Sequence, residues 1–436
     1  MNTIEIIKKI AINLSDYEWI MKVMKSPENK QMYNEKEIPV YDEVTLSHGL
    51  PAICLLFSEL SNKFPEEEWD IKAHELLIRL KDDIECGKVR DLSMFSGYAG
   101  IGLCIESLSK NGTRYERFIK GINEIISETF EKYIEDLYKA KFCFMRDYDI
   151  ISGVSGILSY TLNQNELGRI NEEIKNYLIF RCQDISLEKE SVPGFYIPME
   201  NQFLEEDKKV FKNGNFNLGM AHGIPGILVS LCKIYSRKRE DKIEKAIRKC
   251  ADFLVRFLDE TEVRWGAYVS FEAYCEGKIK SVVTRDAWCY GTPGVSYALY
   301  IAGRSTKEER YKDIAIRAML SVTKNLQGIY SPTFCHGFAG VAYIFLRFYQ
   351  MTNIKEFQIF AEFLKNEIWK YYNQTYPVGF RNIEHLQSTD QIGLLSGVSG
   401  ILLVLLAFED IHKTRWDAAF QLDAFDGLDK GNAIML

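Results

Sequence analysis

The residues best suited to bind a metal ion stand directly before two short glycine-containing motifs. Cys289 lies two residues before Gly291. Cys335 and His336 directly precede Gly337. Two cysteine thiolates and one imidazole form a three-ligand zinc site with an open fourth position, the arrangement of catalytic rather than structural zinc. If the two motifs lie in neighbouring parts of the fold, the three side chains can meet, and we expect them to bind one zinc ion.

The motif before which these residues stand recurs seven times along the chain. It reads Gly, any residue, a small residue or proline, and then Gly or Ala, and an apolar run follows it. Its first glycines are Gly49, Gly97, Gly153, Gly223, Gly291, Gly337 and Gly397. One such motif predicts nothing, but seven of them spread over the chain indicate an internal repeat.

Histidine and cysteine are concentrated next to these glycines. Three of the six histidines and two of the ten cysteines occupy the two positions before a motif glycine. Random placement would put about 0.2 histidines and about 0.3 cysteines there. His222, before Gly223, could exchange a proton with a substrate near neutral pH. His48, before Gly49, has no role that we can assign, and we expect it to be structural.

The segments around the motifs predict helices of two kinds. The intervening segments have apolar residues at helical spacing and charged residues between them, as in 66–85, 242–260 and 354–372, and predict one amphipathic helix per repeat. The runs after the glycines are apolar on all sides and predict fully buried helices. Seven such pairs bury these helices if they close into a ring, where the glycines allow tight turns and close approach. We therefore expect an all-α fold, an α/α toroid of seven inner and seven outer helices, in preference to an open solenoid that would expose apolar faces.

The repeat makes residues 1–436 a single toroidal domain, although length alone suggests two or three domains. Two segments interrupt the helical pattern. Residues 184–217 contain several prolines and glycines, and 194–198 within them could form a strand. Residues 262–284 have the pattern of short extended segments. We expect 184–217 to form a small β-containing inserted subdomain and both segments to be elaborations of the ring.

Composition and local patterns exclude several classes of protein. The net charge of −7 provides no basic surface for nucleic acid. The longest uncharged run, 392–408, is shorter than the about 20 residues of a transmembrane helix, and we expect a buried helix there. Residues 1–14 lack the cleavage site of a signal peptide, which favours a cytoplasmic, reducing compartment. Since no CxxC pair occurs, the eight cysteines other than Cys289 and Cys335 are expected to be small buried residues.

The chain resembles the lanthionine synthetase C-like family, specifically the stand-alone lanthipeptide (lantibiotic) cyclases. The matching segments are 221–226, AHGIPG, 285–294, RDAWCYGTPG, and 335–340, CHGFAG, and the resemblance covers essentially the whole chain. It implies zinc held by Cys289, Cys335 and His336. It also implies that cysteine thiols of a precursor peptide add to dehydroalanine or dehydrobutyrine and form (methyl)lanthionine rings. Because no dehydratase or kinase region precedes the repeats, the class with a separate cyclase fits the length. Stand-alone members carry a small β-containing insertion, for which 184–217 is the candidate.

The resemblance also implies roles for two further residues near the motifs. His222 matches the proposed acid–base histidine of the family and could supply the proton that completes the addition; its structural alternative is to cap a loop. Asp149 matches an acidic position of the family and could orient His222 or take the proton of the substrate thiol. Asp147, two residues earlier, competes with Asp149 for this assignment.

Two residues close to Cys289 are candidates for binding the reacting groups. Arg285 could stabilise the enolate that forms when the thiol attacks the alkene. Tyr290 could form a hydrogen bond in the pocket. Both have ordinary structural alternatives, which are a salt bridge with Asp286 for Arg285 and aromatic packing for Tyr290.

The expected partner is a dehydrated lanthipeptide precursor. A dehydratase and an exporter that form a synthetase complex with the cyclase are a family expectation, and through them the protein could lie peripherally at the membrane. Two other functions stay open. A zinc protein prenyltransferase also forms a thioether, and a zinc-containing relative could bind thiols or peptides without cyclase activity. A toroidal glycosidase would need a second carboxylate facing Asp149, and the motif positions offer no obvious one.

Overall fold

The computed structural model describes residues 2–33, 36–187, 190–279, 285–409 and 415–424. Contacts among the residues divide the chain into two compact units. Unit 1 consists of Met1–Ile122 and Ile329–Trp416, and unit 2 of Asn123–Gly328 and Asp417–Leu436.

Among the residues that the structure describes, seven helices begin directly after the first glycine of a motif, which is the N-cap residue in each case. We call them the glycine-capped helices. They are α3 (Leu50–Lys63), α5 (Tyr98–Leu108), α8 (Val154–Thr161), α11 (Ile224–Arg237), α14 (Thr292–Thr306), α16 (Phe338–Thr352) and α18 (Val398–Ala407). Every residue of α8 and α18 is buried, so the prediction of buried apolar helices is confirmed. The uncharged run 392–408 contains α18.

Amphipathic helices pack against the glycine-capped helices. They are α1 (Thr3–Leu14), α4 (Trp69–Glu85), α6 (Glu116–Lys139), α9 (Gly168–Cys182), α12 (Asp241–Arg256), α15 (Glu309–Lys324) and α17 (Lys355–Trp369). In α12, the buried Ile243, Ile247, Cys250 and Leu254 recur at steps of three and four residues, which places them on one face of the helix. The predicted alternation of amphipathic and buried helices is therefore confirmed.

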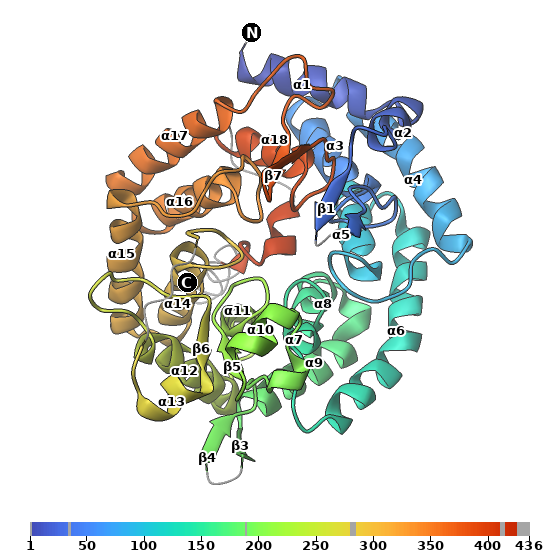
Figure 1. Ribbon diagram of the computed structural model, residues 1–436. Helices are drawn as coiled ribbons and strands as arrows, with labels where there is room; N and C mark the ends of the chain where they lie inside the picture. The colour runs from blue at the N-terminus through green and yellow to red at the C-terminus, as the bar shows by residue number, and fades with distance from the viewer. Residues whose placement is uncertain (1, 34–35, 188–189, 280–284, 410–414, 425–436) are drawn as a thin grey trace, which may run out of the picture. The chain divides into compact units, whose positions relative to one another are not determined.

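Each unit contains consecutive pairs of these helices (Figure 1). In unit 2, α8, α11 and α14 pack in this order, and α9, α12 and α15 pack against them. In unit 1, the glycine-capped helices pack in the order α16, α18, α3 and α5. The helix that covers α18 comes from the other end of the chain, because α1 packs against both α18 and α3.

The loops that precede the glycine-capped helices are joined by backbone hydrogen bonds. In unit 2, an amide donates to a carbonyl oxygen in the pairs Ile150–Ala221 (3.0 Å) and Ala221–Cys289 (3.3 Å). In unit 1, the pairs are Cys335–Leu395 (2.9 Å), Leu394–Leu46 (3.1 Å) and Ser47–Phe95 (3.0 Å). Within each unit, the residues before the motif glycines are therefore held side by side through their main chains.

The last glycine of the motif makes room for a neighbouring loop. A Cβ atom on Gly226 would lie 3.0 Å from a side-chain carbon of Ile150, and one on Gly294 would lie 2.7 Å from Cβ of Met220. The side chain of the preceding loop thus occupies the space that a Cβ would fill, as the predicted close approach requires.

The inserted segment 184–217 contains β structure, but not where we predicted it. Its described residues form the hairpin β3 (Asp184–Leu187) and β4 (Glu190–Pro193), the short helices η2 (Met199–Asn201) and α10 (Glu205–Val210), and strand β5 (Asn215–Asn217). The strand predicted over 194–198 is wrong, since only Ile197 makes an isolated bridge, to Asn215. Segment 262–284 contains strand β6 (Tyr268–Ser270) and helix α13 (Phe271–Glu276), and its end, 280–284, lies outside the described residues.

The remaining described elements are short. They are α2 (Tyr17–Met24), α7 (Met145–Tyr148), the hairpins β1 (Gln31–Tyr33) with β2 (Lys36–Ile38) and β7 (Asn382–Glu384) with β8 (Gln387–Thr389), and the turns η1 (Asn165–Leu167) and η3 (Trp416–Phe420). Among the described helices, none combines the length and the apolar character needed to cross a bilayer.

The last described residues of the chain are bound inside unit 2. Gln421 Nε2 donates to the carbonyl oxygen of Ser155 at 2.8 Å and to Ser230 Oγ at 2.7 Å. The indole of Trp288 donates to the carbonyl oxygen of Phe420 at 3.2 Å. Residues 417–424 thus connect α8, α11 and the loop before α14.

The prediction that eight cysteines are small buried residues is correct for six of them. Cys54, Cys104, Cys143, Cys182, Cys232 and Cys250 are buried. The prediction is wrong for Cys86 and Cys275, which are exposed. Cys86 follows the last residue of α4, and Cys275 lies on the short helix α13, so neither is on the buried face of a long helix.

Replacement of Gly97 by alanine tests the packing of the loops. A Cβ there would lie 2.2 Å from the Asp91 carbonyl oxygen and 2.5 Å from the Ser93 amide nitrogen. We expect Gly97→Ala to lower the free energy of unfolding by about 3 kcal/mol, the upper range for an overpacked buried site. In the matched control, Gly121→Ala in α6, the new Cβ meets no atom within 4 Å, and we expect a gain of about 0.5–1 kcal/mol. Urea unfolding midpoints measure both, and equal effects would contradict the packing argument.

Candidate functional site

A histidine–carboxylate pair lies at the start of two neighbouring glycine-capped helices in unit 2. His222 Nδ1 lies 2.6 Å from Asp149 Oδ2. His222 precedes the N-cap glycine of α11, and Asp149 follows α7 and precedes α8. Because the carboxylate accepts the Nδ1 proton, Nε2 is the nitrogen left to exchange a proton with a substrate.

The backbone holds the carboxylate of Asp149 in place. Its Oδ1 accepts hydrogen bonds from the amides of Ser152 at 2.6 Å and Gly153 at 2.8 Å. Asp149 is almost fully buried, with a side-chain exposure of 1%, whereas the side chain of His222 is 27% exposed. The pair therefore combines a fixed carboxylate with an imidazole that solvent can reach.

The structure distinguishes Asp149 from Asp147. Asp147 Oδ2 accepts a hydrogen bond from the amide of Phe144 at 2.8 Å and so caps α7. Burial raises the pKa of Asp147, and the hydrogen bond from Phe144 opposes that shift. Asp149, and not Asp147, is the carboxylate hydrogen-bonded to His222.

The surroundings of His222 favour its protonated form. Burial acts to lower its pKa, but the hydrogen bond to Asp149 and the charge of that carboxylate outweigh burial, so the pKa is raised above its ordinary value. A histidine of this kind is suited to donate a proton at neutral pH.

Tyr290 lies beside this pair and is bound through its hydroxyl group. The ring centroids of His222 and Tyr290 are 6.2 Å apart. Asn217 Nδ2 donates to the hydroxyl of Tyr290 at 3.1 Å, and the hydroxyl of Tyr268 lies 3.2 Å from it. Burial raises the pKa of Tyr290 well above its ordinary value, so the phenol is neutral at physiological pH.

Cys289 and Arg285 lie in the loop that leads to α14. The side chain of Cys289 is buried, and its carbonyl oxygen accepts the hydrogen bond from Ala221. Gly291 has φ +101°, a conformation that favours glycine, and a Cβ there would lie 2.1 Å from the carbonyl oxygen of Arg285. Asp286 pairs with Arg264 and accepts a hydrogen bond from the amide of Gln327.

Cys335 and His336 belong to unit 1, where they precede the N-cap glycine of α16. The amide of Cys335 donates to the carbonyl oxygen of Leu395 at 2.9 Å. His336 is buried, and its Nε2 lies 3.9 Å from Glu384 Oε2. A carboxylate near one ring nitrogen is a common neighbour of a metal-binding histidine.

The donor chemistry of the predicted metal ligands fits zinc, which is bound by thiolates and imidazoles. Cys289 lies in unit 2, whereas Cys335 and His336 lie in unit 1. Within the part of the chain that the structure describes, no three His, Cys, Asp or Glu residues form a group ready to hold a metal ion. Zinc binding by these residues therefore stays a prediction.

His48 lies in unit 1 and forms a local contact. Its Nδ1 is 2.8 Å from Ser47 Oγ, and burial lowers its pKa. This environment agrees with the structural role that we expected for it.

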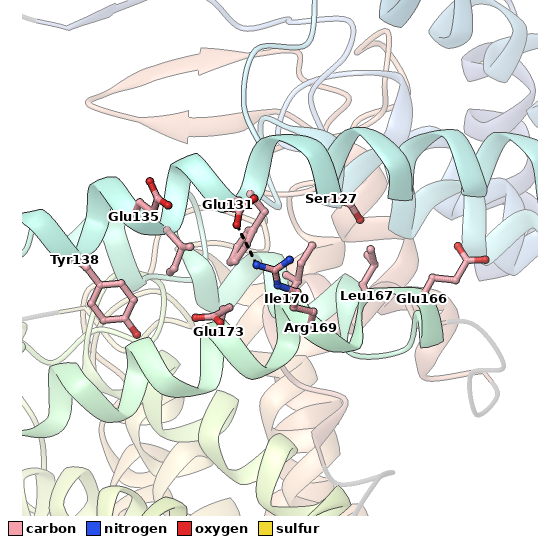
Figure 2. Close-up of a pocket in the computed structure, with 11 residues that line it drawn as sticks. Ser127, Glu131, Glu135, Tyr138, Glu166, Leu167, Arg169, Ile170 and Glu173 are labelled. Atoms are coloured by element: carbon pink, nitrogen blue, oxygen red, sulfur yellow. Dashed lines mark hydrogen bonds and ion pairs between the residues drawn. The ribbon is translucent and has the colours of Figure 1, made fainter.

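A separate hollow lies between α6 and α9 in unit 2 (Figure 2). Its volume is about 390 Å³. Its wall contains Glu131, which pairs with Arg169 at 3.0 Å, and the apolar residues Phe130 and Ile170. None of the predicted site residues lines this hollow.

Two residues that contact Tyr290 were not predicted. Asn217 stands at the end of the inserted segment, and Tyr268 lies in the segment that follows α12. Neither precedes a motif glycine directly, so the repeat carried no signal for them. They approach Tyr290 because β5 and β6 pair with each other.

The sequence of the chain is similar to one protein family and to two individual proteins. Residues 41–421 match the family described as lanthionine synthetase C-like protein. The nisin biosynthesis protein NisC of Lactococcus lactis subsp. lactis is 28% identical over 432 residues, which cover 94% of this chain and 99% of that protein. Glutathione S-transferase LANCL1 of Danio rerio is 22% identical over 327 residues, 64% of this chain and 75% of that protein.

A solved structure supports the fold. The structure named nisin cyclase matches with a TM-score of 0.82 and 26% identity, and covers 97% of this chain and 99% of that one. Nisin cyclase is an α/α toroid, and this likeness confirms the predicted fold class.

Two substitutions of Asp149 separate its contacts. Asp149→Ala removes the acceptor of the Ser152 and Gly153 amides, and we expect it to lower the free energy of unfolding by about 2–3 kcal/mol. Asp149→Asn keeps one acceptor oxygen, and we expect a loss below about 1 kcal/mol. Its amide group donates to His222 Nδ1, so the proton of the imidazole moves to Nε2. Urea unfolding and ¹⁵N shifts of the imidazole measure these effects, and equal destabilisation by both variants would contradict the capping role.

Proposed function

Because the chain belongs to the lanthionine synthetase C-like family, we propose that it is a lanthipeptide cyclase. It forms (methyl)lanthionine rings by adding cysteine thiols of a precursor peptide to its dehydroalanine or dehydrobutyrine residues. The observation that carries the proposal is the His222–Asp149 pair beside Tyr290 and Cys289, in a chain that is similar to NisC over nearly its whole length.

The proposal includes a zinc ion bound by Cys289, Cys335 and His336. Support comes from their donor chemistry and from their positions before the N-cap glycines of consecutive glycine-capped helices. Held by these three residues with a fourth position open to the substrate, zinc would lower the pKa of a substrate thiol and so supply its thiolate form at neutral pH. The thiolates of Cys289 and Cys335 would offset the charge of the ion, so a substrate sulfur would keep more electron density there than at an all-histidine site.

The residues of unit 2 then complete the addition. The substrate sulfur forms a bond with the β-carbon of the dehydroamino acid, and the electrons of the alkene move onto the α-carbon and its carbonyl group as an enolate. Protonated His222 donates a proton from Nε2 to the α-carbon. Asp149 holds the ring through Nδ1 and stabilises the imidazolium before the transfer. The thiol loses one proton and the α-carbon gains one, so the reaction is a net addition without oxidation or reduction.

Arg285 and Tyr290 bind the reacting peptide in this proposal. The guanidinium group of Arg285 stabilises the negative charge that develops on the enolate oxygen. The hydroxyl of Tyr290, next to His222, forms a hydrogen bond with the peptide. Both residues flank Cys289 in the loop before α14.

The substrate is a precursor peptide whose serine and threonine residues have been dehydrated. Since dehydration precedes ring formation, a dehydratase must supply this substrate, and a complex with that enzyme and an exporter is part of the proposal. We place the protein in the cytoplasm, where precursor peptides are synthesised and cysteines stay reduced.

The likeness to LANCL1, named a glutathione S-transferase, favours one alternative. In that alternative, the same site binds a free thiol such as glutathione rather than a cysteine of the peptide. The two functions give different products from one dehydrated peptide. The cyclase leaves the peptide mass unchanged and removes its free thiols, whereas the transferase adds the mass of glutathione.

Zinc content tests the ligand assignment. We expect about one zinc per chain in the purified protein, and loss of most of it in Cys289→Ala, Cys335→Ala and His336→Ala. Cys232→Ala, which changes a buried cysteine of α11, serves as the matched control and should keep its zinc. Elemental analysis by mass spectrometry measures the stoichiometry. Full occupancy in both Cys335→Ala and His336→Ala would refute the assignment.

Ring formation tests the reaction and the role of His222. The unsubstituted protein should make the thiols of a dehydrated precursor peptide resistant to alkylation, as measured by mass spectrometry. His222→Asn should keep its zinc and lose at least about 100-fold in rate, the usual contribution of a general acid. An unchanged rate and stereochemistry in His222→Asn would exclude the acid–base role, and addition of glutathione without loss of peptide thiols would favour the transferase.

A further inference from the structure

A small two-stranded ribbon of unit 2 ends at the hydroxyl of Tyr290. Its strands β5 and β6 are antiparallel, and Asn217 pairs directly with Tyr268 across the ribbon. Directly paired residues project their side chains from the same face of a ribbon. Both of these side chains reach the hydroxyl of Tyr290, Asn217 through Nδ2 at 3.1 Å and Tyr268 through its own hydroxyl at 3.2 Å.

Further contacts hold the side chains of Asn217 and Tyr268 in place. Asn217 is fully buried, and its Oδ1 accepts a hydrogen bond from the amide of Gly219 at 2.8 Å. The ring of Tyr268 lies 5.3 Å from that of Phe211, the residue that follows α10. Elements of the inserted segment thus fix both groups that contact Tyr290.

Two contacts restrict the hydroxyl of Tyr290. The amide of Asn217 donates to its oxygen and so occupies one lone pair. The hydroxyls of Tyr290 and Tyr268 share a second hydrogen bond, in which either group can be the donor. These two hydrogen bonds limit the orientation of the Tyr290 hydroxyl.

We propose that Asn217 and Tyr268 are positioning residues that fix the hydroxyl of Tyr290 for a hydrogen bond with the peptide substrate. A phenol hydroxyl offers one donor and two acceptor positions, and the contacts with Asn217 and Tyr268 use two of these three. The third position is left for a polar group of the precursor peptide, which Tyr290 thereby orients.

This inference rests on the proposed cyclase function and assigns a role to the inserted segments. Phe211 and Asn217 belong to 184–217, and Tyr268 belongs to 262–284. The insertion is thereby part of the catalytic architecture of unit 2, because it determines the orientation of a group beside His222.

A double-mutant cycle on the full-length protein tests the proposal. The variants are Tyr268→Phe, Tyr290→Phe and the double variant, and the assay is ring formation with a dehydrated precursor peptide. Tyr268→Phe lets the hydroxyl of Tyr290 rotate, and we expect kcat to fall about 3- to 10-fold, the effect of one hydrogen bond, with KM changed less than twofold. In the Tyr290→Phe background, Tyr268→Phe should cause no further loss, because the two residues act through one hydroxyl.

Tyr274→Phe is the matched control. The hydroxyl of Tyr274, on α13 directly after β6, donates to the carbonyl oxygen of Ser191 rather than to Tyr290. We expect its kcat and KM to equal those of the unsubstituted protein. Asn217→Asp is the second variant, for use if Tyr268→Phe does not fold. Its carboxylate keeps an acceptor for the amide of Gly219 but cannot donate to Tyr290. We expect the same loss of kcat as for Tyr268→Phe, and no further loss in the Tyr290→Phe background.

The outcomes separate this inference from the proposed function. Ring formation by the unsubstituted protein together with additive losses in the cycle, or with no loss in Tyr268→Phe, would overturn the inference alone. A kcat loss that Tyr274→Phe shares would reduce Tyr268 to a purely structural role and would also overturn it. Absence of ring formation by the unsubstituted protein would overturn the proposed function and the inference together.

Discussion

Backbone hydrogen bonds between successive motif loops are the interactions on which the rest of the structure depends. Each loop ends in a glycine that caps a buried helix, and within each unit the main chains of neighbouring loops are hydrogen-bonded, as Ile150 is to Ala221 and Ala221 is to Cys289. Such bonds do not depend on side-chain identity. The side chains of the residues before the glycines are therefore available for chemistry, and His222 and Cys289 occupy such positions. A rigid main chain that carries variable side chains is a general way to build a precise site.

The charge environment of His222 in unit 2 follows from the way the motif loops are joined. The loop before α8 places a buried carboxylate, Asp149, against the imidazole that the next loop supplies, and two backbone amides satisfy the second oxygen of that carboxylate. A buried charge is tolerated where hydrogen bonds compensate its lost hydration. The pairing then orients His222 and supports its protonated form. The same loops thus determine both the geometry of the pair and the protonation of the histidine.

The fold could be predicted, and candidate site residues could be named, because their signals are local. The glycines that cap helices recur with the repeat, and His222, Cys289 and Cys335 stand at fixed offsets from them. The inserted segment could not be predicted equally well, because short strands depend on partners that are distant in sequence. The strand expected at 194–198 is wrong, and Tyr268 reaches Tyr290 only through the pairing of β6 with β5. The sequence favoured Asp149 but left Asp147 as a competitor, because the difference between them is which carboxylate the short helix α7 uses as its cap.

The segment bound inside unit 2 has a consequence for the order of folding. Unit 2 consists of 123–328 and of residues from 417 onward, and the chain completes all of unit 1 between these parts. The indole of Trp288, next to Cys289, is bonded to Phe420, and Gln421 joins α8 to α11. During synthesis, the loop that carries Cys289 and Tyr290 therefore lacks part of its support until residues 417–424 have emerged. Assembly of the site is thus delayed until both units have been synthesised, and an incomplete chain has the helices of unit 2 without their final contacts.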